Sequence, residues 1–370
     1  MERAPASEFA FSSLARALNA RALEGSTAPS DSRWAFAFNS SGLTPDSKAA
    51  LLNLPGSELG DNALWIDGAE LEQLASSDQA AACFLESRRG FERIPGRPKL
   101  MGVLNLTPDS FSDGGRYSDL ETAIARAHEL VAEGAEIVDV GGESTRPGAP
   151  PVSEEEELAR VLPLIRAFAP QTKVQISIDT TKASVARQAI AAGCKVVNDV
   201  SGGLFDPEIL RVVADSEATY VCMHTLGRPE TMQQDVHYED PTAEVCGALR
   251  ARVEACLEAK ISLDKIVVDP GIGFGKRLAD NLDLLKRLSE LRSLGLPILM
   301  GVSRKSFIGQ LNQGVSGAAD TESRLGGTAA AIAACVAGGA EFLRVHDVAA
   351  MSEAARVAYA IGSPNPFTAS

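Results

Sequence analysis

The chain has 370 residues, of which 45% are hydrophobic and 23% are charged. This composition supplies enough apolar side chains for a large core and argues against an intrinsically disordered chain. The formal net charge is -14. It argues against binding to nucleic acid or to a membrane surface, because both are held mainly by lysine and arginine. An anionic small molecule would have to meet a local cluster of basic side chains.

Three regions are predicted along the chain: an N-terminal extension or mini-domain of unknown role (1–97), a large domain (98–362) and a C-terminal tail (363–370). The extension is rich in turn residues, and Pro95–Pro98 is typical of a linker. We expect a helix over Gly68–Ala82 and a small core. The expected core residues are Trp34, Phe36, Phe38, Trp65 and Ile66.

The six cysteines contain no C-x-x-C pair, which indicates buried thiols in a reducing compartment rather than a disulfide framework. Met1–Gly25 is faintly similar to an organellar transit peptide, but its three glutamates argue against that role. No segment has the roughly 20 apolar residues of a membrane span. We therefore expect a cytoplasmic protein.

From Lys99 onward, short β-branched apolar runs alternate with longer stretches of helical periodicity. Near-continuous apolar runs are typical of strands buried on both faces of a parallel sheet. Eight strand–helix units in about 260 residues favour a (β/α)₈ TIM barrel. A doubly wound sheet is the alternative, but the G-x-G-x-x-G turn expected after its first strand is absent. The predicted strands are Leu100–Leu106, Glu136–Gly141, Val174–Asp179, Val196–Val200, Thr219–His224, Ile266–Asp269, Ile298–Val302 and Phe342–His346.

Capping residues predict where several of the helices begin. Ser153 followed by Glu156 is a capping box that opens a helix over Glu154–Phe168. Asp206 and Asp240 each precede a proline, the order expected when an acidic cap is followed by proline at the first helical position.

Polar residues lie at or just after the C-terminal end of every predicted strand, where a barrel places its active site. A buried unpaired polar atom costs about 1–3 kcal/mol, so a complete polar ring indicates function as well as structure. Carboxylates and an amide suit the donors and acceptors of a fused amino-pyrimidinone. Arg146, Arg344 and His346 offer cations for an anionic leaving group. The ring is formed by Asn105, Asp139, Glu143, Asp179, Asn198, Asp199, His224, Asp269, Ser303, Lys305, Arg344 and His346.

Seven segments in this region resemble the signature segments of dihydropteroate synthases, in that family's order and spacing. They span essentially the whole predicted barrel. The segments are MGVLNLTPDSFSDGG (101–115), GGESTRPG (141–148), SIDTTK (177–182), NDVSGG (198–203), DPGIGFGK (269–276), GVSRKSFIG (301–309) and FLRVHDV (342–348).

The resemblance implies condensation of 6-hydroxymethyl-7,8-dihydropterin pyrophosphate with p-aminobenzoate, by an S_N1-like substitution, in folate biosynthesis. Asp179, Asn198, Asp269 and Lys305 would hold the pterin, with Met223 and Phe274 lining its pocket. Asn105, Arg344 and His346 would bind pyrophosphate with Mg²⁺, assisted by Thr145 and Arg146. Phe111, Pro147, Lys305 and Ser303 would shape the p-aminobenzoate site, and Asp113 would organise the closed loops.

Two other functions stay open at this stage: a pterin-dependent methyltransferase barrel and a catalytically silent paralogue. Product formation would distinguish both from a synthase. The resemblance also implies a homodimer formed through late helices such as Thr321–Ala337, and a p-aminobenzoate site that sulfonamides target. The segment 223–229 only approximates the family pattern, which puts local substrate contacts there in doubt.

Overall fold

The computed structural model describes residues 97–106, 116–145, 148–312 and 324–362, together with four short strands nearer the N-terminus. These four strands form an antiparallel sheet in the order β1-β2-β4-β3 and belong to a compact unit separate from the one that contains the larger sheet. Trp34 pairs in register with Ile66. Phe38 and the helix expected over Gly68–Ala82 lie outside the described residues. The bounds are β1 (Arg21–Ala22), β2 (Arg33–Ala37), β3 (Glu58–Leu59) and β4 (Ala63–Asp67).

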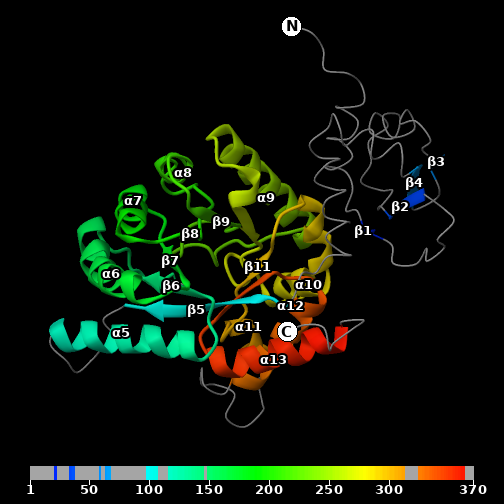
Figure 1. Ribbon diagram of the computed structural model, residues 1–370. Helices are drawn as coiled ribbons and strands as arrows, with labels where there is room; N and C mark the ends of the chain where they lie inside the picture. The colour runs from blue at the N-terminus through cyan, green and yellow to red at the C-terminus, as the bar shows by residue number, and fades with distance from the viewer. Residues whose placement is uncertain are drawn as a thin grey trace, which may run out of the picture. The chain divides into compact units, whose positions relative to one another are not determined.

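The second unit is the predicted (β/α)₈ barrel (Figure 1). Its eight parallel strands follow the order β10-β9-β8-β7-β6-β5-β12-β11. A parallel bridge between Val268 and Ile298 joins β10 to the residue before β11 and closes the ring. The strands are β5 (Lys99–Asn105), β6 (Ile137–Gly141), β7 (Gln175–Asp179), β8 (Val196–Asp199), β9 (Thr219–Met223), β10 (Ile266–Asp269), β11 (Leu299–Met300) and β12 (Phe342–Val345).

Helices cover the outer face of the strands (Figure 1). The longer ones are α5 (Arg116–Ala132), α6 (Glu154–Phe168), α7 (Ala183–Ala192), α8 (Glu208–Ala214), α9 (Pro241–Glu258), α10 (Leu278–Lys286), α11 (Ser306–Leu311), α12 (Leu325–Ala337) and α13 (Val348–Gly362). Three 3₁₀ segments are η3 (Ala169–Gln171), η4 (Leu263–Lys265) and η5 (Leu288–Leu294). None of the helices in the described ranges has the length and apolar character needed to cross a membrane.

The predicted caps differ in how they are realised. Ser153 accepts a hydrogen bond from the Glu156 backbone N–H at 3.2 Å, but the Glu156 side chain pairs with Arg160 instead of completing the box. Asp240 caps α9 by accepting from the Ala243 N–H at 3.1 Å. Helix α8 begins at Glu208, so Pro207 is its N-cap residue and not its first helical residue. The predicted cap is therefore displaced by one residue.

One apolar layer fills the barrel interior, and strand periodicity explains what lies above it. The layer is formed by Met101, Ile137, Val196, Val221, Val267 and Leu299, with Phe342 packed against it. Alternate residues of a strand share a face. The interior positions two residues further along therefore include Asp139, Asn198, Asp269 and Arg344. These members of the polar ring form the upper layer of the same interior, whereas Asp199 and His224 are one residue out of this alternation and bond to Tyr220 and Lys276.

Candidate active site at the mouth of the barrel

Arg344 on β12 connects two carboxylates from other strands. Its Nε donates to Asp139 Oδ2 and its Nη2 donates to Asp179 Oδ2, both at 2.7 Å. Asn198 Nδ2 also donates to Asp139 Oδ2, at 3.1 Å. Two carboxylates share one guanidinium, so this group carries an excess negative charge when both are ionised. The sequence assigned Arg344 to binding of the anionic leaving group, whereas in the structure its guanidinium bonds to the carboxylates Asp139 and Asp179.

Asp179 has an unsatisfied acceptor in this network. Its side chain is 5% exposed, and burial raises its pKa to about 7 against the opposing effect of Arg344. Its Oδ1 is buried without a hydrogen-bond partner among the described residues. Buried polar atoms in native proteins nearly always have a partner. The atom is thus suited to accept a hydrogen bond from a ligand.

Asp269, at the end of β10, is held by the loop that follows it. Its Oδ1 accepts from the Gly271 N–H at 2.7 Å. Burial raises its pKa, and the Gly271 N–H opposes the shift, followed by Lys305 and Arg344. Gly271 has φ 70°, and a β-carbon there would lie 1.9 Å from the His224 carbonyl oxygen. Only glycine fits this turn.

Lys305 approaches the same loop from the end of the next strand. Its Nζ lies 4.2 Å from the centroid of the Phe274 ring, within cation–π range. Burial lowers its pKa to about 8, and Arg344 adds to the effect. Phe274 belongs to a buried cluster with Met223, Val200 and Met232. The expected lining residues Met223 and Phe274 are thus brought together next to the lysine.

Ser303 and His346 form a pair at the ends of β11 and β12. Ser303 Oγ lies 3.2 Å from the His346 backbone N and 3.1 Å from its Nδ1. Both contacts are satisfied if Oγ accepts from the backbone N–H and donates to Nδ1, which leaves the ring proton on Nε2. Burial lowers the pKa of His346 to about 3, with Arg344 adding to the shift. The sequence predicted a cation here, whereas burial beside a guanidinium favours the uncharged imidazole at neutral pH.

The loop after β6 is fixed at its base by ion pairs. Lys182 Nζ lies 2.7 Å from Glu143 Oε2 and 2.5 Å from Glu157 Oε2. Glu143 also accepts from the Val152 N–H at 2.8 Å. Lys182 thereby ties this loop to α6. Thr145 lies on the loop and is half-buried. Arg146, Pro147, Phe111 and Asp113 lie outside the described residues.

Asn105 is the one predicted metal ligand. A β-carbon at Gly141 would lie 3.3 Å from Asn105 Oδ1 and 3.8 Å from Asp179 Oδ2, so both oxygens flank this glycine. Among the described residues, no group of three or more His, Cys, Asp or Glu side chains could hold a metal ion. Mg²⁺ often takes one or two protein ligands and completes its shell with water and substrate phosphate. A single amide oxygen fits that arrangement and not a protein-only metal site.

Comparison with known proteins supports a specific family. The model of the pterin binding enzyme family matches residues 101–346. A dihydropteroate synthase of Synechocystis sp. is 48% identical over 266 residues, covering 72% of this chain and 90% of that protein. The chain belongs to the dihydropteroate synthases.

Solved structures of this family share the barrel. The Xanthomonas albilineans dihydropteroate synthase with 4-aminobenzoic acid is 44% identical, with a TM-score of 0.67 over 73% of this chain and 94% of the other. The Yersinia pestis dihydropteroate synthase in a sulfonamide drug complex is 41% identical, also with a TM-score of 0.67, over 72% of this chain and 94% of the other.

Two buried residues of the site were given no role from the sequence. Asp139 lies two residues after the core residue Ile137 on the same strand, so the alternation of strand side chains predicts that it faces the barrel interior. Lys276 ends the DPGIGFGK segment and is 3% exposed. No periodicity distinguished it from a surface lysine.

Proposed function

We propose that the mouth of this barrel transfers the dihydropterin-6-ylmethyl group from pyrophosphate to the amino nitrogen of p-aminobenzoate, giving 7,8-dihydropteroate and pyrophosphate. The activity is that of the family, a transferase reaction of folate biosynthesis. The observation that carries the proposal for these residues is the interior row of Asp179, Asn198 and Asp269 beside Lys305. It combines buried acceptors, an amide and a partly desolvated ammonium in one apolar-walled site.

The pterin would lie along this row. An amino-pyrimidinone presents N–H donors beside a carbonyl acceptor, and the unpartnered Oδ1 of Asp179 and the carboxylate of Asp269 accept such donors. Lys305 can donate to the ring carbonyl or a ring nitrogen. Met223 and Phe274 supply the flat apolar surface that a fused heterocycle packs against.

The pyrophosphate would lie near Arg344, His346 and Asn105, with Thr145 and Arg146 closing from the loop. Neutral His346 with its proton on Nε2 would serve as a hydrogen-bond donor to a phosphate oxygen. Asn105 would hold Mg²⁺ together with pyrophosphate oxygens. When bound, the ion would neutralise charge on the leaving group.

The substitution follows from the electronic properties of the two substrates. Cleavage of the C–O bond leaves a methylene cation that is conjugated with the electron-rich dihydropterin, and the two bond electrons leave with pyrophosphate. The uncharged arylamine then forms the C–N bond and loses a proton. In their ionised forms, Asp179 and Asp269 would place negative charge near the cation and favour its formation electrostatically. Closed loops would exclude the water that otherwise traps it.

The p-aminobenzoate site would be formed by Phe111, Pro147, Ser303 and Lys305, with Asp113 helping to organise the closed loops. Ser303 already bonds His346, so it would link the arylamine site to the pyrophosphate site. A family relative binds 4-aminobenzoic acid, and another binds a sulfonamide drug. We propose that this chain binds p-aminobenzoate and sulfonamides at the same site.

The test is a pyrophosphate-release assay. Purified full-length protein receives Mg²⁺, the pterin pyrophosphate and p-aminobenzoate, and the product is identified by mass. Release should depend on p-aminobenzoate, and a sulfonamide should compete with p-aminobenzoate but not with the pterin. Non-competitive inhibition would contradict the assigned arylamine site. Absence of dihydropteroate would contradict the reaction.

The two alternative functions are weaker than the synthase. A methyltransferase barrel shares the pterin contacts but has no use for Arg344, His346 and the loops near them. A silent paralogue has no reason to keep desolvated charges such as Asp179 unsatisfied, since each costs free energy. The curated relatives at 45% and 48% identity are dihydropteroate synthases.

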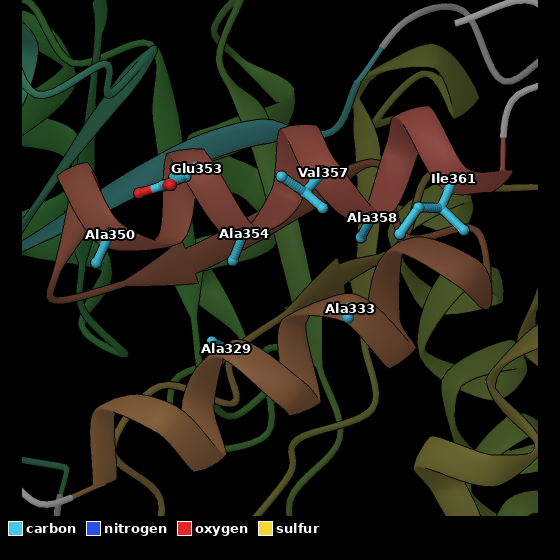
Figure 2. A pocket seen from close by; sticks show the side chains of 8 residues that line it. All are labelled: Ala329, Ala333, Ala350, Glu353, Ala354, Val357, Ala358 and Ile361. Carbon is cyan, nitrogen blue, oxygen red and sulfur yellow. The ribbon is translucent and has the colours of Figure 1, made fainter.

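We further propose a homodimer through the last two helices. A hollow of about 410 Å³ lies between α12 and α13. Figure 2 shows the side chains that line it, most of which are alanine. Val357 and Ile361 at its rim are 55% and 82% exposed. Small residues allow close helix approach, and exposed apolar patches mark association sites. A second copy would cover the same face under two-fold symmetry. The hollow is lined by Ala329, Ala333, Ala350, Glu353, Ala354, Val357, Ala358 and Ile361.

The dimer can be tested with two alanine-to-glutamate substitutions on α13. Ala354→Glu places a charge in the hollow and should convert the dimer to a monomer in sedimentation analysis. Ala360→Glu, on an exposed position of the same helix outside the hollow, should leave the dimer intact. A monomeric wild type, or a dimeric Ala354→Glu variant, would contradict the proposed interface.

We also propose a reducing, cytoplasmic location and an N-terminal domain over residues 1–97. Cys194, Cys222, Cys256 and Cys335 are buried free thiols, which suits a reducing compartment.

A further inference from the structure

Lys276 is a buried ammonium with an unusual set of partners. It is 3% exposed and follows the glycine-rich loop after β10. Its Nζ donates to the Phe274 carbonyl oxygen at 3.0 Å and lies 2.9 Å from His224 Nδ1. Both partners are neutral acceptors. A lysine is rarely this buried without an ion pair, because desolvation of the charge is costly.

His224 is suited to be the acceptor in this pair. Burial lowers its pKa to about 3, and the adjacent Lys276 adds to the shift, so the imidazole is neutral. Nδ1 therefore carries a lone pair that accepts from Lys276, and the ring proton lies on Nε2. The His224 backbone N–H donates to the Asp269 carbonyl oxygen at 2.9 Å. His224, which follows β9, is thus bonded both to Asp269 at the end of β10 and to Lys276 in the loop after β10.

Side chains outside the loop Gly271–Gly275 form hydrogen bonds to its backbone. Asn281 Oδ1 accepts from the Gly273 N–H at 2.7 Å, and Gln233 donates to the Gly273 carbonyl at 2.9 Å. Tyr238 donates to the Gly275 carbonyl at 2.9 Å. Lys276 donates a hydrogen bond to the backbone carbonyl of Phe274, the residue whose ring faces Lys305. Fixing this carbonyl fixes the position of the ring.

Lys276 also acts on the charge of the site. The ionisable groups that influence it are Asp269, Lys305 and Asp280, in addition to His224. Burial lowers its pKa to about 7, while Asp269 opposes the shift. In turn, Lys276 is one of the cations that favour the ionised form of Asp269. One side chain thereby affects both the aromatic surface and the carboxylate assigned to the pterin.

We propose that Lys276 and His224 form a positioning pair for the pterin pocket, in which the lysine fixes Phe274 and the histidine orients the lysine. The inference rests on the proposed function, because it assigns the pterin to Phe274 and Asp269. Among the described members of the arylamine site, neither side chain hydrogen-bonds to Ser303 or Lys305. We therefore expect the pair to affect affinity for the pterin more strongly than affinity for p-aminobenzoate.

The test compares variants of the full-length protein by calorimetry and by kinetics. Lys276→Met keeps the aliphatic chain and removes the donor. It should weaken binding of the pterin pyrophosphate about 10-fold or more, the effect of losing a hydrogen bond to a charged group. The KM for p-aminobenzoate should change less than about 2-fold. Lys286→Met, on an exposed position of α10, is the matched control and should bind like the wild type.

A second pair of variants keeps the test valid if Lys276→Met does not fold. His224→Leu removes the acceptor and should weaken pterin binding in the same way. His224→Asn places an amide oxygen where Nδ1 lies and should restore much of the affinity that the leucine variant loses. Equal pterin affinity in His224→Leu and wild type, or equal losses for both substrates, would overturn the proposal. A wild type that binds no pterin would instead refute the proposed function.

Discussion

Replacing Lys305 by alanine is expected to lower kcat/KM for the pterin by about two to three orders of magnitude, as for removal of one preorganised electrostatic donor. Lys305 is the ammonium beside Phe274, and Asp269 and Asp179 are the carboxylates that act on its charge. Without it, the pocket loses its donor to the heterocycle and gains uncompensated negative charge. The fold should survive, because Lys305 begins α11 through its backbone and its side chain makes no capping hydrogen bond.

Steady-state kinetics with both substrates varied would measure the effect, and thermal unfolding would check the fold. Lys195→Ala is the matched control, since Lys195 is exposed and directly precedes β8, at the opposite end of the strand from the site. A Lys305→Ala enzyme within about 3-fold of the wild type would remove Lys305 from the site. An unfolded variant would show that its aliphatic chain supports the Gly273 loop, where a β-carbon would lie 3.3 Å from its Cδ.

The barrel was predictable because its strands are buried on both faces. That burial produces apolar runs, and each predicted run agrees with an observed strand to within a few residues; for example, Val174–Asp179 became β7 (Gln175–Asp179). Position in the interior was also predictable in principle. Once Ile137 and Val196 are core residues, Asp139 and Asn198 must face inward two residues later.

Partners and charge states were not predictable. Asp139 and Arg344 are 205 residues apart, and their contact depends on closure of the ring between β5 and β12. Histidine can carry a positive charge, but burial and the nearby charge of Arg344 lower the pKa of His346 and favour its neutral form. Lys276 has no sequence neighbour that marks it as buried. Pairwise electrostatics depend on distances of a few ångströms, which residue patterns do not encode.

Replacing Arg344 by methionine should destabilise the protein by about 3–5 kcal/mol, the usual cost of removing one partner from a buried ion pair. Arg344 donates to Asp139 and Asp179, whose side chains are 0% and 5% exposed. Without it, two buried carboxylates lose the guanidinium that bonds to both of them. The pKa of Asp179, already about 7 because of burial, should rise further.

The sign of the pH dependence follows from this shift. A carboxyl whose folded-state pKa lies above its unfolded value of about 3.9 binds a proton more tightly when folded, so stability falls as pH rises between the two values. The deficit of Arg344→Met relative to wild type should therefore be larger at pH 8 than at pH 5. Chemical denaturation at both pH values measures it.

Two further variants separate charge from packing. Asp139→Asn in the Arg344→Met background removes one of the two uncompensated charges and should recover part of the lost stability at pH 8. Arg344→Lys keeps a cation but cannot place two donors on two carboxylates, so it should fall between wild type and methionine. A deficit that is equal at pH 5 and pH 8 and unaffected by Asp139→Asn would mean that Arg344 contributes through packing. The carboxylates would then be stabilised by something other than this guanidinium.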